Sequence, residues 1–253
     1  MRSKILAISL ILVGLLATAA GLGLRLLVTE DEGHHDGRAP TFALDSTLGT
    51  DELVVTPVGA EPEIVVSIER AGQPVTDWDS VHGAPMHVLA VRDDLRWFTH
   101  VDPEMLPDGL SAPVALNPGG QYRVVTQSAP GGGADLLELG TDIALAGELV
   151  ASDQMISTDD FWTEGDLEIR REGLDFVLSE PWGGEDYHDE AALLTMFRAG
   201  DLAFAQGHAI TPDPDRFRFN LEIPGRGEYL AALQFYRGDA SGVLITALFR
   251  FEL

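Results

Sequence analysis

The sequence predicts an all-β protein built from two small antiparallel β-sandwich domains in tandem, after an N-terminal hydrophobic helix. From Leu53 onward, short runs rich in Val, Ile, Phe and Tyr are separated by Gly and Pro at intervals of roughly ten residues, which is typical of antiparallel sandwiches and barrels. Long amphipathic helical patterns are missing from the same region. An internal repeat adds a third observation, because it predicts two copies of one β-unit.

The N-terminal residues 1–27 are typical of a membrane-targeting segment. Arg2 and Lys4 precede residues 5–24, an uncharged and mostly apolar stretch of about the length that crosses a bilayer core. We expect an uncleaved signal anchor, because the apolar stretch continues past the small residues 17–19. Cleavage there, which would give a secreted protein, is the alternative. Both interpretations place the remaining chain outside the cytoplasm, in the periplasm or the extracellular space.

Residues 28–51 are predicted to form an acidic stalk, because they show no sustained hydrophobic period. His34, His35 and Asp36 in this stalk are compatible with weak binding of Cu(II) or Ni(II). A solvated stalk without a ligand is the alternative.

The two immunoglobulin-like domains are expected at residues 52–150 and 169–253, joined by a polar linker at 151–168. The predicted strands of the first domain are 53–56, 64–68, 86–91, 97–101, 122–127 and 143–150. Those of the second domain are 216–223, 229–236 and 243–252. The strand at 216–223 is the clearest, because apolar and polar residues alternate along it as in a half-buried strand.

The internal repeat supports this division into two domains. Asp94-Leu95, Pro118-Gly119, Tyr122 and Gln127 in the first half correspond to Asp201-Leu202, Pro224-Gly225, Tyr229 and Gln234 in the second. The intervals between the corresponding residues are nearly the same in the two halves. We therefore expect two copies of one unit, with a single long sandwich as the alternative.

Charge and composition exclude several classes of function. Asp and Glu total 41 against 16 Lys and Arg, which gives a formal net charge of −25. Such a surface repels nucleic acids and anionic lipid headgroups and attracts cations, although it would also suit a protein solvated in a salty exterior. Cysteine is absent, which removes disulfides, thiolate metal sites and cysteine nucleophiles. Hydrolase, metalloprotease and nucleotide-binding motifs are also missing, so we expect no enzyme activity.

A cluster of His and Met residues in the first domain carries the functional prediction. If strands 86–91 and 97–101 pair as a hairpin, His87 and His100 lie close together near its open end. Imidazole and thioether donors suit copper, and imidazole alone also suits zinc. The candidate ligands are His82, Met86, His87, His100 and Asp102, with Met105 nearby. The alternative is that the histidines make ordinary hydrogen bonds or lie exposed, and that Met86 fills the core.

These residues also carry a family resemblance. Residues 82–95, H-G-A-P-M-H-V-L-A-V-R-D-D-L, and residues 98–103, F-T-H-V-D-P, resemble the hallmark of bacterial secreted immunoglobulin-like proteins related to YtkA-like domains. Residues 197–204 and 229–235 resemble the second copy found in two-domain members. The resemblance covers about residues 52–253 and implies extracytoplasmic β-sandwiches associated with heavy-metal or copper handling.

The resemblance also implies which ligands are kept and which are replaced. His82, Met86, His87 and His100 match the family pattern directly, while Asp102 stands where the second His of H-x-H-P is expected. In the second copy, Gln206 replaces the first His of this motif, His208 keeps the second, and Leu193 occupies a further histidine position.

The acidic segment 185–190, which contains His188, could bind Ca²⁺ through its carboxylates. It lacks the spacing of a defined calcium loop, so we interpret it as a solvated face.

Two function hypotheses follow from the sequence. The first is an extracytoplasmic, non-catalytic module that binds copper, or zinc, through the histidines of the first domain. The second is a metal-free scaffold or accessory subunit that docks on a partner in the membrane or cell envelope. Convergence of the histidines within a few ångströms would favour the first, and separated, exposed histidines would favour the second.

Overall fold

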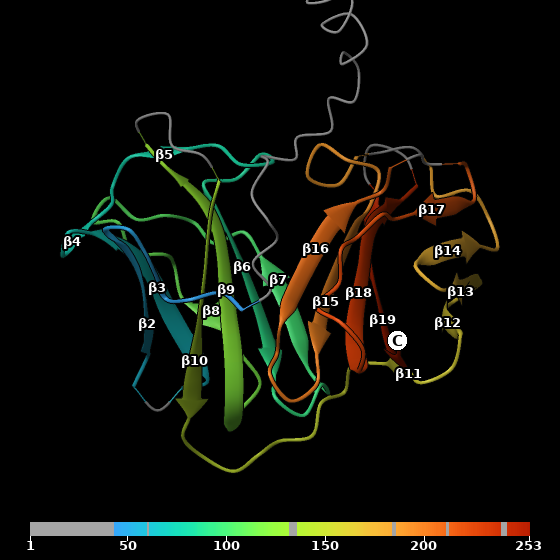
Figure 1. The fold of residues 1–253 in the computed structure, drawn as a ribbon, viewed down its shortest axis with the longest axis horizontal. Helices are drawn as coiled ribbons and strands as arrows, with labels where there is room; N and C mark the ends of the chain where they lie inside the picture. Colours follow the sequence, from blue (N-terminus) through green and yellow to red (C-terminus); the bar gives the residue numbers. More distant parts are fainter. Residues whose placement is uncertain (1–42, 60, 132–135, 184–185, 211–212, 239–241) are drawn as a thin grey trace, which may run out of the picture. The chain divides into compact units, whose positions relative to one another are not determined.

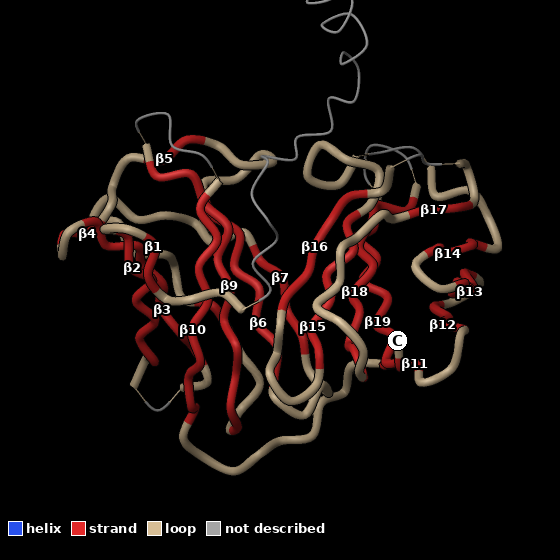
Figure 2. Tube along the Cα trace, in the orientation of Figure 1, coloured by secondary structure: helices blue, strands red, loops and turns tan. Residues whose placement is uncertain are grey.

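The computed structural model describes residues 43–59, 61–131, 136–183, 186–210, 213–238 and 242–253. These residues form 19 strands and no helix, which confirms the all-β prediction (Figure 2). In this described part, no helix is long and apolar enough to cross a membrane. The expected anchor at 1–27 and the motif of His34, His35 and Asp36 lie outside the described residues.

The first β-unit contains strands β1 to β10, arranged in two sheets (Figure 1). One sheet has the order β1 (Thr47–Leu48), β2 (Asp51–Pro57), β3 (Glu63–Arg70) and β4 (Gln73–Pro74), with β8 (Val114–Ala115) also paired to β3. The other has the order β10 (Leu137–Leu145), β9 (Gly120–Pro130), β6 (Met86–Arg92) and β7 (Phe98–Val101), with β5 (Trp78–Asp79) paired to β9. All of these pairs are antiparallel.

The second β-unit contains strands β11 to β19, again in two sheets. One sheet has the order β11 (Ile156–Ser157), β19 (Val243–Glu252), β18 (Glu228–Arg237), β15 (Leu193–Arg198) and β16 (Phe204–His208). The other has the order β12 (Phe161–Glu164), β13 (Leu167–Glu172), β14 (Asp175–Leu178) and β17 (Arg216–Arg218). Only β11 and β19 pair in parallel among these described strands.

Strands β14, β15 and β16 were not expected from the sequence, and β1 lies in the segment expected as a stalk. Three further segments differ from the sequence-based expectation. The segment 151–168, expected as a linker, contains β11, β12 and the first residues of β13. The strand expected at 143–150 is β10, which begins earlier and ends at Leu145. The strand expected at 216–223 ends at Arg218, although the apolar residues that follow still pack against the core of the second unit.

The internal repeat is visible in the structure. Strands β6, β7, β9 and β10 of the first unit have the same antiparallel pairing as β15, β16, β18 and β19 of the second. Arg92 binds Asp94 through two hydrogen bonds, and Arg198 binds Asp201 in the same way. A tyrosine hydroxyl donates to a nearby carbonyl in each unit, Tyr122 to Asn117 and Tyr229 to Gly225.

Strand alternation sorts the apolar residues into three cores. Met86, Val88 and Ala90 point from β6 into the core of the first unit, while Leu89 and Val91 point to the opposite face and join Phe197 and Leu230 of the second unit. A third core fills the second unit. The described residues are accordingly one compact unit, in which the two β-units share an apolar interface.

Candidate metal centre

Three side chains of the first unit gather at the open end of the β6–β7 hairpin. The register pairs Val88 with Val101 and Leu89 with His100, so the next position on the same face sets His87 opposite Asp102. The sequence predicts that His87 and His100 lie close together near the open end of this hairpin. In the observed register His100 is opposite Leu89, two positions from His87, and because the side-chain period of a strand is two, His87, His100 and Asp102 lie on one face.

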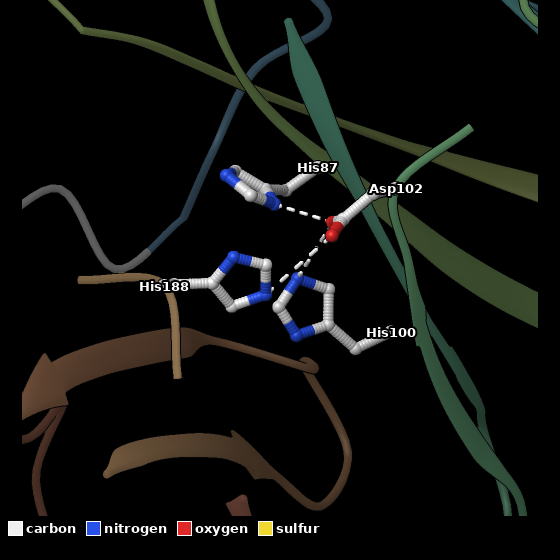
Figure 3. A group of neighbouring side chains, drawn as sticks. All are labelled: His87, His100, Asp102 and His188. Carbon is white, nitrogen blue, oxygen red and sulfur yellow. Dashed lines mark hydrogen bonds and ion pairs between the residues drawn. The ribbon is translucent and has the colours of Figure 1, made fainter. Parts of the chain in front are cut away.

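The second β-unit contributes a fourth side chain, His188. It lies in a tight turn between Tyr187 and Glu190, before β15. One potential ligand atom from each of His87, His100, Asp102 and His188 lies within 4.8 Å of the others (Figure 3).

The three imidazoles surround the carboxylate of Asp102. The contact from His87 Nδ1 to Asp102 Oδ1 measures 2.6 Å. His100 Nε2 lies 3.9 Å from Oδ1, and His188 Nε2 lies 3.7 Å from Oδ2. A cation between these four groups would meet three nitrogens and one oxygen.

The outer nitrogen of each imidazole faces an oxygen acceptor. These contacts are His87 Nε2 to Val81 O at 2.8 Å, His100 Nδ1 to Gln234 Oε1 at 2.9 Å, and His188 Nδ1 to His82 O at 3.1 Å. Since a neutral imidazole carries one proton, donation through Nδ1 of His100 and His188 leaves a lone pair on their Nε2 atoms. Metal-ligating histidines in proteins are held in this way. His87 differs, because both of its nitrogens face oxygen acceptors, and its Nδ1 would have to bind the metal in place of its contact with Asp102.

Burial keeps the inner nitrogens available for a metal. The Nε2 atoms of His100 and His188 are buried and have no hydrogen-bond partner. Burial lowers the pKa of His100 to about 4 and also lowers the pKa of His188, so both rings are neutral at pH 7. A buried polar atom without a partner is costly, and a bound cation would satisfy both nitrogens.

Asp102 supplies the negative charge. Burial alone would raise the pKa of Asp102, but the hydrogen bond with His87 and the neighbouring imidazoles lower it overall. Three neutral imidazoles and one carboxylate are a ligand set that zinc accepts in tetrahedral geometry.

The structure places the other predicted ligands elsewhere. Met86 is fully buried on the opposite face of β6, in the core of the first unit, because adjacent residues of a strand point to opposite faces. Met105 packs against the same core. The ring of His82 lies 6.3 Å from that of His87 and 4.8 Å from that of His208, so it belongs to the surroundings of the centre.

His188 was missed by the sequence analysis because it lies in an acidic segment interpreted as solvated. One signal was present: His82 and His188 precede corresponding strands of the repeat, β6 and β15. Both occupy turns with backbone φ above zero, 46° at His82 and 56° at His188. Such backbone is uncommon for residues other than Gly and clusters at functional sites.

Comparison with models of known protein families finds a match over part of the chain, within the first unit. Residues 44–143 match the model of a domain of unknown function, DUF8832. This match does not link the chain to the YtkA-like domains that its motifs resemble. No curated protein matches the sequence.

Proposed function

We propose that this chain is an extracytoplasmic, non-catalytic protein that binds a divalent metal ion through His87, His100, His188 and Asp102. The observation that supports the proposal most strongly is the orientation of the three imidazoles. Each ring directs its outer nitrogen to an oxygen acceptor, while the inner nitrogens converge on one carboxylate. Separate structural histidines have no reason to share this orientation.

The donor set favours Zn²⁺ or Cu²⁺. Imidazole and carboxylate are borderline and hard donors, whereas soft thioether sulfur is the donor that selects Cu(I). Because Met86 points into the core of the first unit, the reason for placing copper before zinc is removed. Zinc is therefore our first candidate, and Cu²⁺ is the second.

The arrangement also favours binding without catalysis. Four protein donors complete a tetrahedral shell, whereas catalytic zinc sites keep one position open for water or substrate. The cavity beside the centre has a volume of about 10 Å³, which is the space of one water molecule. An organic substrate would not fit there.

The extracytoplasmic location is supported by the basic residues and apolar segment at the N-terminus. The net charge of −25 would raise the local concentration of cations around the protein.

Elemental analysis of the full-length chain after exposure to Zn²⁺ and Cu²⁺ tests the proposal. The wild type should retain one tightly bound equivalent, and the double variant His87→Ala/His100→Ala should lose it. The control His34→Ala/His35→Ala also removes two imidazoles, but from the N-terminal segment, and should keep the tight equivalent. Equal metal retention by all three proteins would exclude the proposed centre and favour the metal-free docking scaffold.

A further inference from the structure

The turns before β6 and β15 are equivalent, and each directs its histidine toward the other β-unit. Val81 and Ala84 exchange two backbone hydrogen bonds across one turn, and Tyr187 and Glu190 do the same across the other. The two central residues of each turn have positive φ, as type I′ turns require. His82 and His188 occupy the same position in these turns.

Each turn histidine reaches a residue of the other β-unit. His188 of the second unit reaches Asp102 of the first, and the ring of His82 of the first unit lies 4.8 Å from that of His208 of the second. The Nδ1 atom of His188 contacts the carbonyl of His82 at 3.1 Å. The centre therefore has an approximate two-fold relation to a second position.

The strand register identifies the members of this second position. Leu193 pairs with His208 on β15 and β16, as His87 lies opposite Asp102 in the first unit. Gln206 occupies the position equivalent to His100, because it pairs with Thr195 as His100 pairs with Leu89. The second position thus keeps two imidazoles, His82 and His208, and has lost the other two donors.

A carboxylate lies beside one of these imidazoles. His208 Nδ1 is 3.9 Å from Glu190 Oε1. We propose that His82, His208 and Glu190 form a second and weaker site for a divalent transition-metal ion, through which the metal enters and leaves the centre described above. This inference rests on the proposed function, because a metal must first occupy that centre.

The surroundings of the second position support this inference. One small cavity is lined by His82, His87, His100, His188 and His208, which are five of the seven histidines of the chain.

The second position has the more accessible imidazole. The side chain of His208 is 29% exposed, against 1% for His100 and 9% for His188, while the carboxylates Glu190 and Asp102 are similarly exposed, 43% and 40%. A cation arriving from solvent therefore reaches His208 with less desolvation than the buried rings of His100 and His188 require. Three donors also bind more weakly than four, so an ion held here can leave again.

The experiment is a zinc titration of the full-length protein followed by transfer to a chelator. The wild type should bind two equivalents, of which one is weaker by at least tenfold. His208→Gln should keep the tight equivalent, lose the weak one, and release the tight metal more slowly. If the wild type binds one equivalent only, or if His208→Gln leaves both equivalents unchanged, the second site is excluded while the first remains. Loss of all binding in the wild type would instead exclude the proposed function.

A gain-of-function variant tests the same site independently. Leu193→His should place a third imidazole opposite His208 and tighten the weak equivalent by at least tenfold. The control Leu193→Asn introduces a polar side chain without an imidazole and should not tighten zinc binding at the weak site. Equal zinc affinity of these two variants for the weak equivalent would overturn the proposal.

Discussion

Gln234 holds His100 in the orientation that a metal requires. Its Oε1 atom accepts from Nδ1 of His100 at 2.9 Å, which directs the lone pair of Nε2 toward Asp102. Removal of such outer partners typically weakens metal affinity ten- to a hundredfold. We expect Gln234→Leu to weaken zinc binding by about this factor, as measured by competition with a chromogenic chelator.

Gln127 provides a matched control for this prediction. It occupies the position in the first unit that is equivalent to Gln234 and lines the same small cavity as the imidazoles, but its amide donates to Glu138. Gln127→Leu should therefore leave the zinc affinity within about threefold of the wild type, a small change beside the tenfold loss expected above. An equal loss in both variants would contradict the positioning role of Gln234.

His188 combines two tasks, because it is a ligand and also forms a turn with φ of 56°. Asn tolerates this backbone conformation better than other residues with a side chain. His188→Asn should therefore lose tight zinc binding and largely retain the stability of the metal-free protein. His188→Ala should also lose zinc binding. Its free energy of unfolding, measured by urea denaturation, should fall by about 1 kcal/mol. Retention of tight zinc by His188→Asn would exclude His188 as a ligand.

The candidate site was partly predictable at this scale. His87, His100 and Asp102 lie close in sequence on one hairpin, so strand alternation alone places them on one face. The same alternation places Met86 and His87 on opposite faces of the strand, so the strand period alone argues against Met86 as a ligand beside His87. His188 could not be found from local pattern, because its contact with Asp102 depends on how the two β-units pack.

At the scale of elements, the loop that follows β6 and the loop that follows β15 are each held by an arginine, which is buried in the first unit and partly exposed in the second. The side chain of Arg92 is 1% exposed and binds Asp94 twice, whereas that of Arg198 is 23% exposed and binds Asp201. Breaking a buried pair leaves an uncompensated charge, while an exposed pair contributes little. We expect Asp94→Asn to destabilise the fold by about 2–3 kcal/mol and Asp201→Asn by less than about 1 kcal/mol, as measured by urea denaturation.

The effect of Asp94→Asn should depend on pH. Burial alone would raise the pKa of Asp94, but the hydrogen bond from Arg92 and further contacts with Arg96 lower it overall. A lowered pKa in the folded state contributes stability above the unfolded pKa, and this contribution is lost as the pH falls through the folded value. The wild type and Asp94→Asn should therefore differ at pH 7 and converge at pH values below the folded pKa of Asp94. A difference that persists there would show that charge is not its cause.

Several elements were predictable from nearly continuous apolar runs, although β15, which is such a run, was not expected. Runs such as Met86–Arg92 and Glu228–Arg237 are rich in Val, Leu and Ala and are buried on both faces, which gives a strong apolar signal. Strands β12 and β13 were missed because charged residues such as Glu164, Glu168 and Arg170 alternate along them, facing solvent in the second unit. Their pattern resembles that of a polar linker.

At the scale of the molecule, the metal centre depends on the interface between the β-units. Leu89, Phe98 and Val125 of the first unit pack with Phe197, Leu230 and Leu248 of the second. The metal would be held by ligands from both units, since His188 belongs to the second and the other ligands to the first. Packing at the interface and metal binding should therefore stabilise each other.

This coupling can be measured with two phenylalanine variants. Phe197→Leu lies in the shared interface, whereas Phe176→Leu lies in the separate core of the second unit. Both should destabilise the metal-free protein by about 1–1.5 kcal/mol. Only Phe197→Leu should also weaken zinc binding, because it alone alters how His188 approaches the first unit.

Thermal unfolding with and without zinc provides the readout. Zinc at one hundred times its dissociation constant should raise the free energy of unfolding of the wild type by about 2.7 kcal/mol. The same zinc concentration should stabilise Phe176→Leu by the same amount. Zinc should stabilise Phe197→Leu less. This variant binds zinc more weakly, so the same zinc concentration is a smaller multiple of its dissociation constant. Equal gains by both variants would show that the centre is held by the β6–β7 hairpin and the turn at His188 without any contribution from the shared apolar interface.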